Sequence, residues 1–325
     1  VAVALGAGLY LPSLPSQIGA LYEARDPRRT WAYNIYYMGM NTGSLIAPLI
    51  CGTLGELFGW HWGFGAAGIG MLLGVAIYVL GARHLPADAP LPQQKRSSSR
   101  HGLPGWHRFG LMAVLALCVM LYRGANEQTG NTLALWLDTG VDRRLAGLTI
   151  PMTWFQSLNP VMVLLLTPLL VFHWKGAAAR GSVPSDVARM AMGAAILAGG
   201  FVFLAGVVRL DGASTNPGWV VAFFVILTVG ELYMMPAALA VFNRLAPTGF
   251  VALGAALWFL TASGGNLIAG ALGTLWSSMP PVAFFLMLAA VSASAGLFLR
   301  LLVRAVAEAD ARIADEARSP RPRMA

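Results

Sequence analysis

Three charged side chains interrupt long apolar runs of the chain: Arg123, Glu127 and Glu231. Ionisable groups inside membrane segments are costly, face a bundle interior or a wet cavity, and mark pathways for ions and charged solutes. Glu231 follows Gly230 near the middle of its run and has no cation nearby in the sequence. It is therefore suited to alternate between a protonated form and a charged form bound to an amine. The alternative is a carboxyl that stays protonated and donates a hydrogen bond between helices.

Arg123 and Glu127 are four residues apart, which places both on one face of a helix. The segment 123–132 is too polar to face lipid, whereas the segment before it is almost wholly apolar. We expect this face to meet water or a ligand, with Asn126 as a further candidate for ligand binding. The alternative is that the two charges only neutralise each other so that the helix can insert.

Membrane helices are the elements that must position these residues. Of 325 residues, 57% are apolar and 11% are charged, whereas about a quarter of the residues of a soluble domain are charged. We expect an all-α membrane protein. Runs long enough to cross the hydrocarbon core are predicted at nine places: 1–21, 33–58, 62–82, 109–137, 150–174, 187–210, 219–242, 250–276 and 282–303.

The loops predict both the orientation and the organisation of the chain. Lys and Arg gather in alternate loops and in the tail, which places these parts in the cytoplasm. A long polar stretch separates three spans from six, and major facilitator transporters contain two six-helix halves built from three-helix repeats. We therefore expect a major facilitator fold with nine of twelve helices (helices 4 to 12), the first three lying before Val1; the alternative is an unrelated nine-helix protein. The expected parts are 1–83 (second half of the N-terminal bundle), 84–107 (cytoplasmic linker), 108–304 (C-terminal bundle) and 305–325 (cytoplasmic tail).

Several classes of function are disfavoured. The net charge of +8 comes mostly from short loops, which argues against a nucleic-acid partner. Cys51 and Cys118 lie in apolar runs, so neither a disulfide nor a metal site is expected, and the histidines have no cluster of potential metal ligands around them. We expect no cofactor and no enzymatic activity.

Several separated motifs resemble the proton-dependent oligopeptide transporter family, a branch of the major facilitator superfamily. The tenth- and eleventh-helix pattern of the family is matched by Gly230-Glu231-Leu232, Pro236, Leu245-Ala246-Pro247 and Trp258-Phe259-Leu260. The segments 36–45 and 59–64 resemble its fifth helix and the following turn, Glu127-Gln128 its seventh helix, and Gln156-Ser157-Leu158-Asn159-Pro160 its eighth.

This resemblance implies a symporter that imports di- and tripeptides together with protons by alternating access. By motif position, Glu231 should bind the amino terminus of the peptide with help from Asn159, Asn41 should hold the carboxyl end, and Trp258 should line a side-chain pocket. Glu127 should belong to the proton-coupled ionic network. Judged from the residues alone, both asparagines could equally hold helices together, and Trp258 could be a core residue.

The sequence departs from the family where a lysine is usual in the fourth helix: Gly6-Ala7-Gly8-Leu9-Tyr10-Leu11-Pro12 has Leu11 at that place. Arg123 stands where an aromatic residue is common, and we hypothesise that it has taken over part of the lysine's role. Two alternatives stay open: a related symporter of another small zwitterionic or anionic solute, and a non-transporting, sensor-like relative. The expected setting is a bacterial inner membrane, with the full-length protein functional as a monomer.

Overall fold

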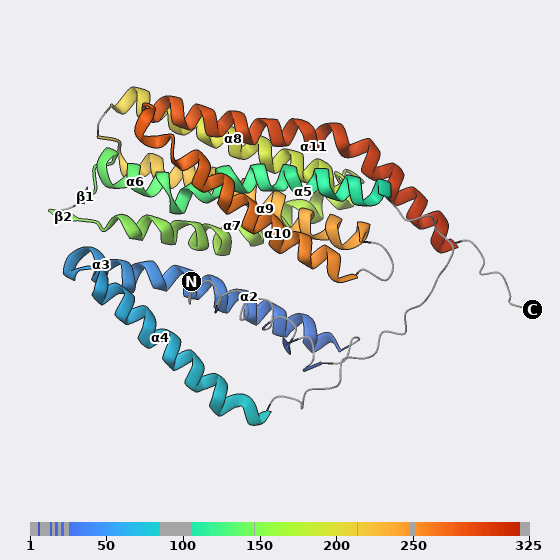
Figure 1. Ribbon diagram of the computed structural model, residues 1–325, viewed down its shortest axis with the longest axis horizontal. Helices are drawn as coiled ribbons and strands as arrows, with labels where there is room; N and C mark the ends of the chain where they lie inside the picture. The colour runs from blue at the N-terminus through green and yellow to red at the C-terminus, as the bar shows by residue number, and fades with distance from the viewer. Residues whose placement is uncertain are drawn as a thin grey trace, which may run out of the picture. The chain divides into compact units, whose positions relative to one another are not determined.

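The computed structural model describes residues 26–84, 106–145, 147–212, 214–246 and 251–318, and a few single positions before residue 26 (Figure 1). The described residues divide into two compact units. The first comprises Val1–Arg96 with Thr153–Val161, and the second comprises Ser97–Met152 with Met162–Ala325. The segment 153–161 therefore packs with the first unit although it follows the start of the second in the chain.

Within the described residues, seven helical segments are long and apolar enough to cross a membrane: Trp60–Gly81, Arg108–Gly140, Met152–Ala179, Asp186–Asp211, Pro217–Leu245, Ala256–Ser278 and Pro281–Arg312. They correspond to the last seven of the nine predicted spans. The predicted span 1–21 lies outside the described residues apart from single positions. The predicted span 33–58 is helical but is not among the seven, because its polar residues lower its mean hydropathy.

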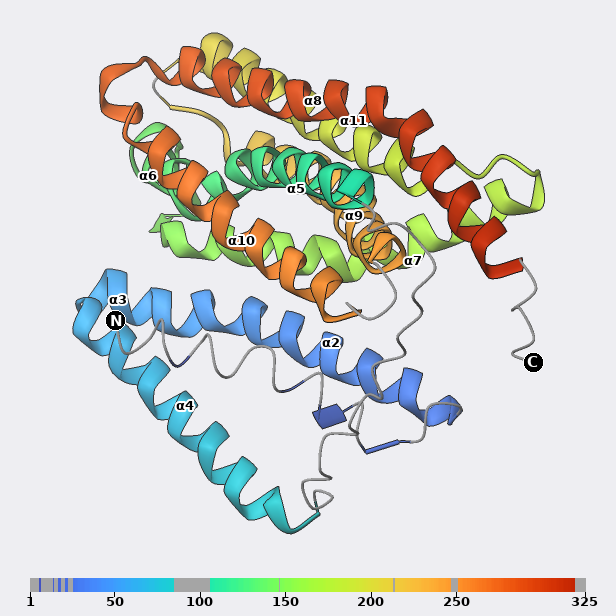
Figure 2. The same cartoon turned by 45° about the vertical axis from the view of Figure 1, so that its right-hand side comes forward.

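The first unit begins with a long helix that changes its winding near its end. Helix α2 (Pro27–Ala47) starts at Asp26, whose side chain accepts a hydrogen bond from the Arg28 amide, and it continues into a π-turn, η1 (Pro48–Gly52), and then α3 (Thr53–Phe58). Gly59 has a φ of 108°, a conformation that side chains disfavour, and it turns the chain into α4 (Trp60–Gly81), which ends in η2 (Ala82–His84). Figures 1 and 2 show α2 and α4 diverging from this turn.

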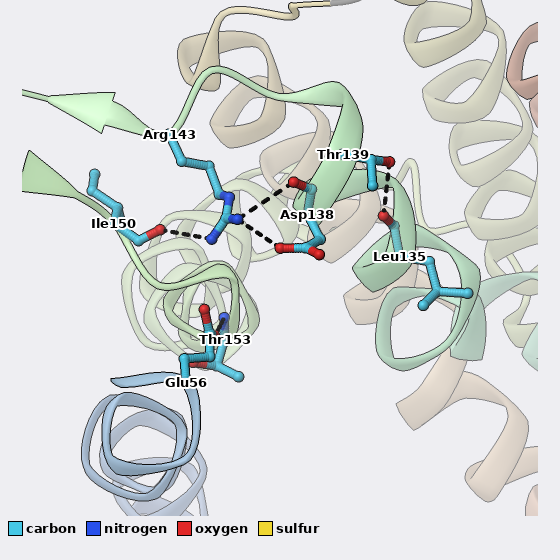
Figure 3. A network of polar contacts seen from close by, with 7 residues as sticks. All are labelled: Glu56, Leu135, Asp138, Thr139, Arg143, Ile150 and Thr153. Carbon is cyan, nitrogen blue, oxygen red and sulfur yellow. Dashed lines mark hydrogen bonds and ion pairs between the residues drawn. The ribbon is translucent and has the colours of Figure 1, made fainter. Parts of the chain in front are cut away.

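The segment η4 (Met152–Ser157) is fastened to the first unit by hydrogen bonds. Glu56 Oε1 accepts a bond of 2.8 Å from the backbone N–H of Thr153, as Figure 3 shows. Trp154 Nε1 donates to Thr53 Oγ1 at 2.7 Å, and Ser157 Oγ donates to a backbone carbonyl of α2 at 2.8 Å. A carboxylate at the start of a short helix suits the unpaired backbone N–H groups found there.

The second unit is a helical bundle. Its helices are α5 (Trp106–Asn126), α6 (Thr132–Gly140), the part of α7 (Leu158–Ala179) after residue 161, α8 (Asp186–Asp211), α9 (Pro217–Leu245), α10 (Val251–Gly273) and α11 (Pro281–Arg318), with η3 (Glu127–Gly130) between α5 and α6 and η5 (Trp276–Ser278) before α11. Helix α8 packs against both α9 and α11, and α10 runs along α5. The buried core is rich in phenylalanine, with Phe201 contacting Phe223 and Phe285 at ring-centroid distances of 5.4 and 6.4 Å.

Two glycines allow α8 and α9 to cross closely. A Cβ atom added to Gly193 would lie 2.6 Å from the carbonyl oxygen of Gly230, and one added to Gly230 would lie 2.9 Å from that of Gly193. Small residues at a helix crossing permit such backbone contact in membrane proteins. Since Gly230 precedes Glu231, this crossing also fixes where α9 presents that carboxyl group.

A short β-hairpin departs from the all-helical expectation. Strands β1 (Arg144–Leu145) and β2 (Leu148–Thr149) pair antiparallel. Arg143 holds the base of the hairpin, donating to the Asp138 carboxylate at 2.6 Å and to the Ile150 carbonyl at 3.1 Å (Figure 3). The hairpin is therefore anchored to α6 by side-chain contacts as well as by the chain.

The last helix is longer than predicted. The expected span ended at residue 303, whereas α11 stays helical to Arg318. Arg244 at the end of α9 joins it to α8, pairing with Asp310 at 2.9 Å and with Asp186 at 2.6 Å. Part of the predicted tail 305–325 is thus a helical extension of the bundle, and residues 319–325 lie outside the described residues.

Candidate functional site

The polar segment 123–132 forms a break in a membrane-crossing helix. Helix α5 ends at Asn126, η3 follows with a tighter winding, and Asn131 leaves helical geometry with φ −121° and ψ −103° before α6 begins. Irregular backbone at membrane depth is tolerated where it is buried in protein or lines a wet cavity. The break therefore agrees with the prediction that this face does not meet lipid.

Arg123 is the centre of the cluster at this break. Its side chain is 10% exposed, and Nη1 lies 3.6 Å from Glu127 Oε1. Its guanidinium carbon lies 4.6 Å from the centre of the Trp258 ring on α10, a distance typical of a cation–π contact. A Cβ atom added to Gly265 of α10 would lie 2.4 Å from Arg123 Cβ, so the glycine leaves room for the arginine. Side chains from α5, η3 and α10 thus meet at the guanidinium of Arg123.

Glu231 approaches the same cluster from α9. It interacts electrostatically with Arg123 and with Tyr122, and its own side chain is half-buried. Pro236 lies five residues later inside the same helix, where it removes a backbone hydrogen bond. Four of the predicted site residues, Arg123, Glu127, Glu231 and Trp258, therefore gather in the second unit.

Buried polar atoms without protein partners surround this cluster. Tyr122 Oη, Arg123 Nε and Asn126 Oδ1 are buried and have no hydrogen-bond partner among the described residues. Buried polar groups in native proteins are almost always hydrogen-bonded to protein, water or ligand. All three atoms are covered by protein, and five further buried polar atoms without a partner lie elsewhere among the described residues, so the role of Asn126 stays a prediction.

Asn41 and Asn159 belong to the first unit. Asn41 Nδ2 donates to the Tyr37 carbonyl of its own helix at 2.9 Å, and Asn159 lies in the first turn of α7. Their expected role in binding the peptide together with Glu231 therefore stays a prediction. Leu11, which stands at the place of the family lysine, lies outside the described residues.

Sequence reasoning missed the role of Gln128. This residue is fully buried, and Nε2 donates to the carbonyl of Ala269 on α10 at 2.9 Å and to that of Gly124 at 3.3 Å. Its Oε1 accepts a hydrogen bond of 2.7 Å from Thr132. The sequence holds one sign of this role: the amide of Gln128 directly follows Glu127 in the polar segment. A buried amide needs hydrogen-bond partners.

The described part of the chain offers no evident metal site. No group of three or more His, Cys, Asp or Glu side chains that could hold a metal ion occurs there. Cys51 is half-buried, Cys118 is buried, and both are free thiols.

Comparison with solved structures identifies the fold. The fold matches a crystal structure of a mutant of peptide transporter POT in complex with alafosfalin, with a TM-score of 0.82 and 24% identity over 94% of this chain and 73% of that chain. The chain therefore has the fold of a membrane transporter of the major facilitator type.

The family follows from the sequence. The profile of the POT family matches residues 1–101 and 105–287, and the chain belongs to this family. An uncharacterized transporter, YclF of Bacillus subtilis, is 30% identical over 93% of this chain and 72% of its own length. The peptide transporter YePEPT of Yersinia enterocolitica is 28% identical over 84% of this chain and 66% of its own length. The family predicted from the separated motifs is thereby confirmed.

Proposed function

We propose that the protein imports di- and tripeptides together with protons by alternating access. The single observation that carries this proposal is the cluster of Arg123, Glu127 and Trp258, with Glu231 in electrostatic range, inside membrane-crossing helices. Membership of the POT family and similarity to a Yersinia peptide transporter support peptides as the cargo. A membrane-crossing protein of this family requires neither a cofactor nor enzymatic chemistry for this task, because the proton is the coupling ion.

In this proposal the peptide is bound at its two ends. Glu231 binds the amino terminus with help from Asn159, and Asn41 holds the carboxyl end. Trp258 lines a side-chain pocket, and Asn126 contributes an amide oxygen that has no protein partner among the described residues. A protonated Glu231 that loses its proton as the peptide amine docks would tie binding to proton transfer.

Arg123 and Glu127 form the second part of the coupling. Two unit charges 4 Å apart attract each other by about 4 kcal/mol at an effective dielectric constant of about 20, and the ion pair here is separated by 3.6 Å. Desolvation of buried ions costs several kcal/mol per ion. Protonation of Glu127 would remove the charge that attracts Arg123 and would release Arg123 to pair with the substrate carboxylate. This assigns to Arg123 part of the role of the lysine that Leu11 replaces.

The proposed setting is a bacterial inner membrane. Seven membrane-length helices among the described residues and relatives in bacteria support it. In this orientation the linker 84–107 and the carboxyl terminus lie in the cytoplasm, and the full-length protein works as a monomer with no nucleic-acid partner.

The test is uptake into liposomes that contain the full-length protein under an imposed proton gradient. Concentrative uptake of a labelled dipeptide, competed by dipeptides and not by free amino acids, is expected for the wild type. Glu231→Gln should abolish this uptake, whereas Glu308→Gln, a matched change at an exposed position of α11, should not. Uptake of another zwitterionic or anionic solute instead would favour the related symporter, and absence of any flux would favour the sensor-like relative. Full gradient-driven uptake by Glu231→Gln would refute the proposed coupling.

A further inference from the structure

A single face of α10 contacts the whole break between α5 and α6. Trp258, Gly265, Ala269 and Gly273 follow at spacings of seven, four and four residues, which places them along one side of the helix. Trp258 and Gly265 contact Arg123, and Ala269 accepts hydrogen bonds from Gln128 and Asn131. We call these four residues and their partners the α5–α10 seam.

Gln128 connects more elements of this seam than any other side chain described above. Its two amide N–H groups reach the end of α5 and the middle of α10, and its oxygen reaches Thr132 at the start of α6. Neighbouring Asn126 and Arg123 each keep a buried atom without a protein partner, whereas both polar ends of the Gln128 amide have partners. The amide of Gln128 is therefore built into the protein and is not available to cargo.

The contacts of Gln128 determine where its neighbour Glu127 can lie. Glu127 opens the turn η3, and the backbone of this turn is fixed to α10 through the next residue. Since Arg123 rests on Gly265 of the same α10 face, a shift of the turn along α10 changes the separation of Arg123 and Glu127. The titratable groups facing this pair are the Glu231 carboxyl from α9 and the neutral Tyr122 hydroxyl from α5, and α10 supplies no titratable side chain.

We propose that Gln128 is a positioning residue for proton coupling, which holds the carboxylate of Glu127 at the distance from Arg123 that the coupling step requires. This inference deepens the proposed function and rests on it. Gln128 acts through Glu127 and contacts neither the proton nor the peptide. Its loss should therefore slow proton-driven turnover and leave peptide affinity in place.

The experiment compares Gln128→Leu, which keeps size and removes both kinds of hydrogen bond, with Thr129→Val in the full-length protein. Thr129 Oγ1 donates only to the Asn126 carbonyl within the same turn at 3.1 Å, so its replacement removes a hydrogen bond without touching α10. In liposomes, Gln128→Leu should lower the maximal rate of proton-driven dipeptide uptake by about tenfold or more, because all three hydrogen bonds of the amide are lost together. The KM for the dipeptide should stay within about twofold, and the midpoint of the pH profile should move. Thr129→Val should match the wild type in all three.

A second pair of variants tests the partner of Gln128. Thr132→Val removes the hydroxyl that contacts Gln128, and Thr132→Ser keeps it. Thr132→Val should therefore show part of the loss of uptake rate seen in Gln128→Leu, and Thr132→Ser should keep the wild-type rate.

A further measurement does not depend on the cargo. In detergent, backbone hydrogen exchange at 269–273 should accelerate in Gln128→Leu and not in Thr129→Val. Unchanged exchange there overturns the inference whatever the protein transports. Faster exchange with an unchanged maximal rate and pH profile also overturns it, because Gln128 would then be structural alone. Failure of the wild type to accumulate any dipeptide refutes the proposed function instead, and the exchange arm still decides whether the seam exists.

Discussion

The crossing of Gly193 and Gly230 brings the backbones of α8 and α9 close together, and it allows a quantitative prediction for Gly193→Ala. The added Cβ would lie 2.6 Å from the Gly230 carbonyl oxygen, so α8 and α9 have to separate by about 0.8 Å to reach ordinary contact at 3.4 Å. Overpacking of this kind costs about 1–3 kcal/mol. The gain of up to about 1 kcal/mol from replacing glycine by alanine in a helix offsets part of this cost.

Gly199→Ala is the matched control for this substitution. Gly199 lies on the same helix, is exposed, and has nothing within 4 Å of an added Cβ. Both variants gain the same helix propensity, so their difference isolates the crossing. At about 2–4 °C per kcal/mol, Gly193→Ala should melt on the order of 2–12 °C below Gly199→Ala.

Thermal unfolding of the two purified variants in the same detergent measures this difference. Dipeptide uptake by each variant then reports on function, because a displaced Gly230 carries Glu231 with it. Gly193→Ala should lose uptake while Gly199→Ala retains it. Equal melting temperatures would refute the reasoning, since they would mean that the crossing relaxes without cost.

The remaining predictions concern the ion pair and the start of α2. Arg123→Lys keeps the charge but loses the planar contact with Trp258, which is worth about 0.5–2 kcal/mol, so gradient-driven uptake should fall by about 2- to 30-fold. Arg123→Gln should abolish uptake at normal expression, and concentrative uptake at the wild-type rate by Arg123→Gln would exclude a coupling role. At the start of α2, the side chain and the backbone N–H of Arg28 lower the pKa of Asp26 below its ordinary value. Because this pKa is lower in the folded state, the interaction of Asp26 with Arg28 stabilises the fold above the unfolded pKa of about 3.9. This stabilisation is lost as the pH falls through the folded-state pKa. Hydrogen exchange at residues 28–30, corrected for its intrinsic pH dependence, should therefore accelerate on acidification, and Asp26→Asn should remove this acceleration.

The pattern of apolar runs predicted the membrane helices well, because their length is set by the bilayer and needs no tertiary information. The polar segment 123–132 also predicted a face turned away from lipid, and the structure shows a broken helix there. The pattern of apolar runs did not predict the π-helical turn at 48–52 or the 3₁₀ turn at 127–130. Such turns change the hydrogen bonding of the backbone, and they form where neighbouring groups in the fold bond to the backbone groups that lose their α-helical partners.

The candidate site was predictable in part for a similar reason. Burying a charge is costly wherever it occurs, so Arg123, Glu127 and Glu231 are conspicuous in the sequence alone. The contact of Arg123 with Trp258 joins residues 135 positions apart, and the bond of Gln128 to Ala269 joins residues 141 positions apart. Neither has a signature in local spacing, because both are created by the packing of α10 on α5.

The extension of α11 has a practical consequence for imaging. From residue 304 to residue 318 the helix adds about 22 Å of rod at 1.5 Å per residue, and Arg244 braces it through Asp310. A helical scaffold protein fused in phase after this rod would inherit its direction. Such a fusion would supply a rigid fiducial for aligning single particles of the protein.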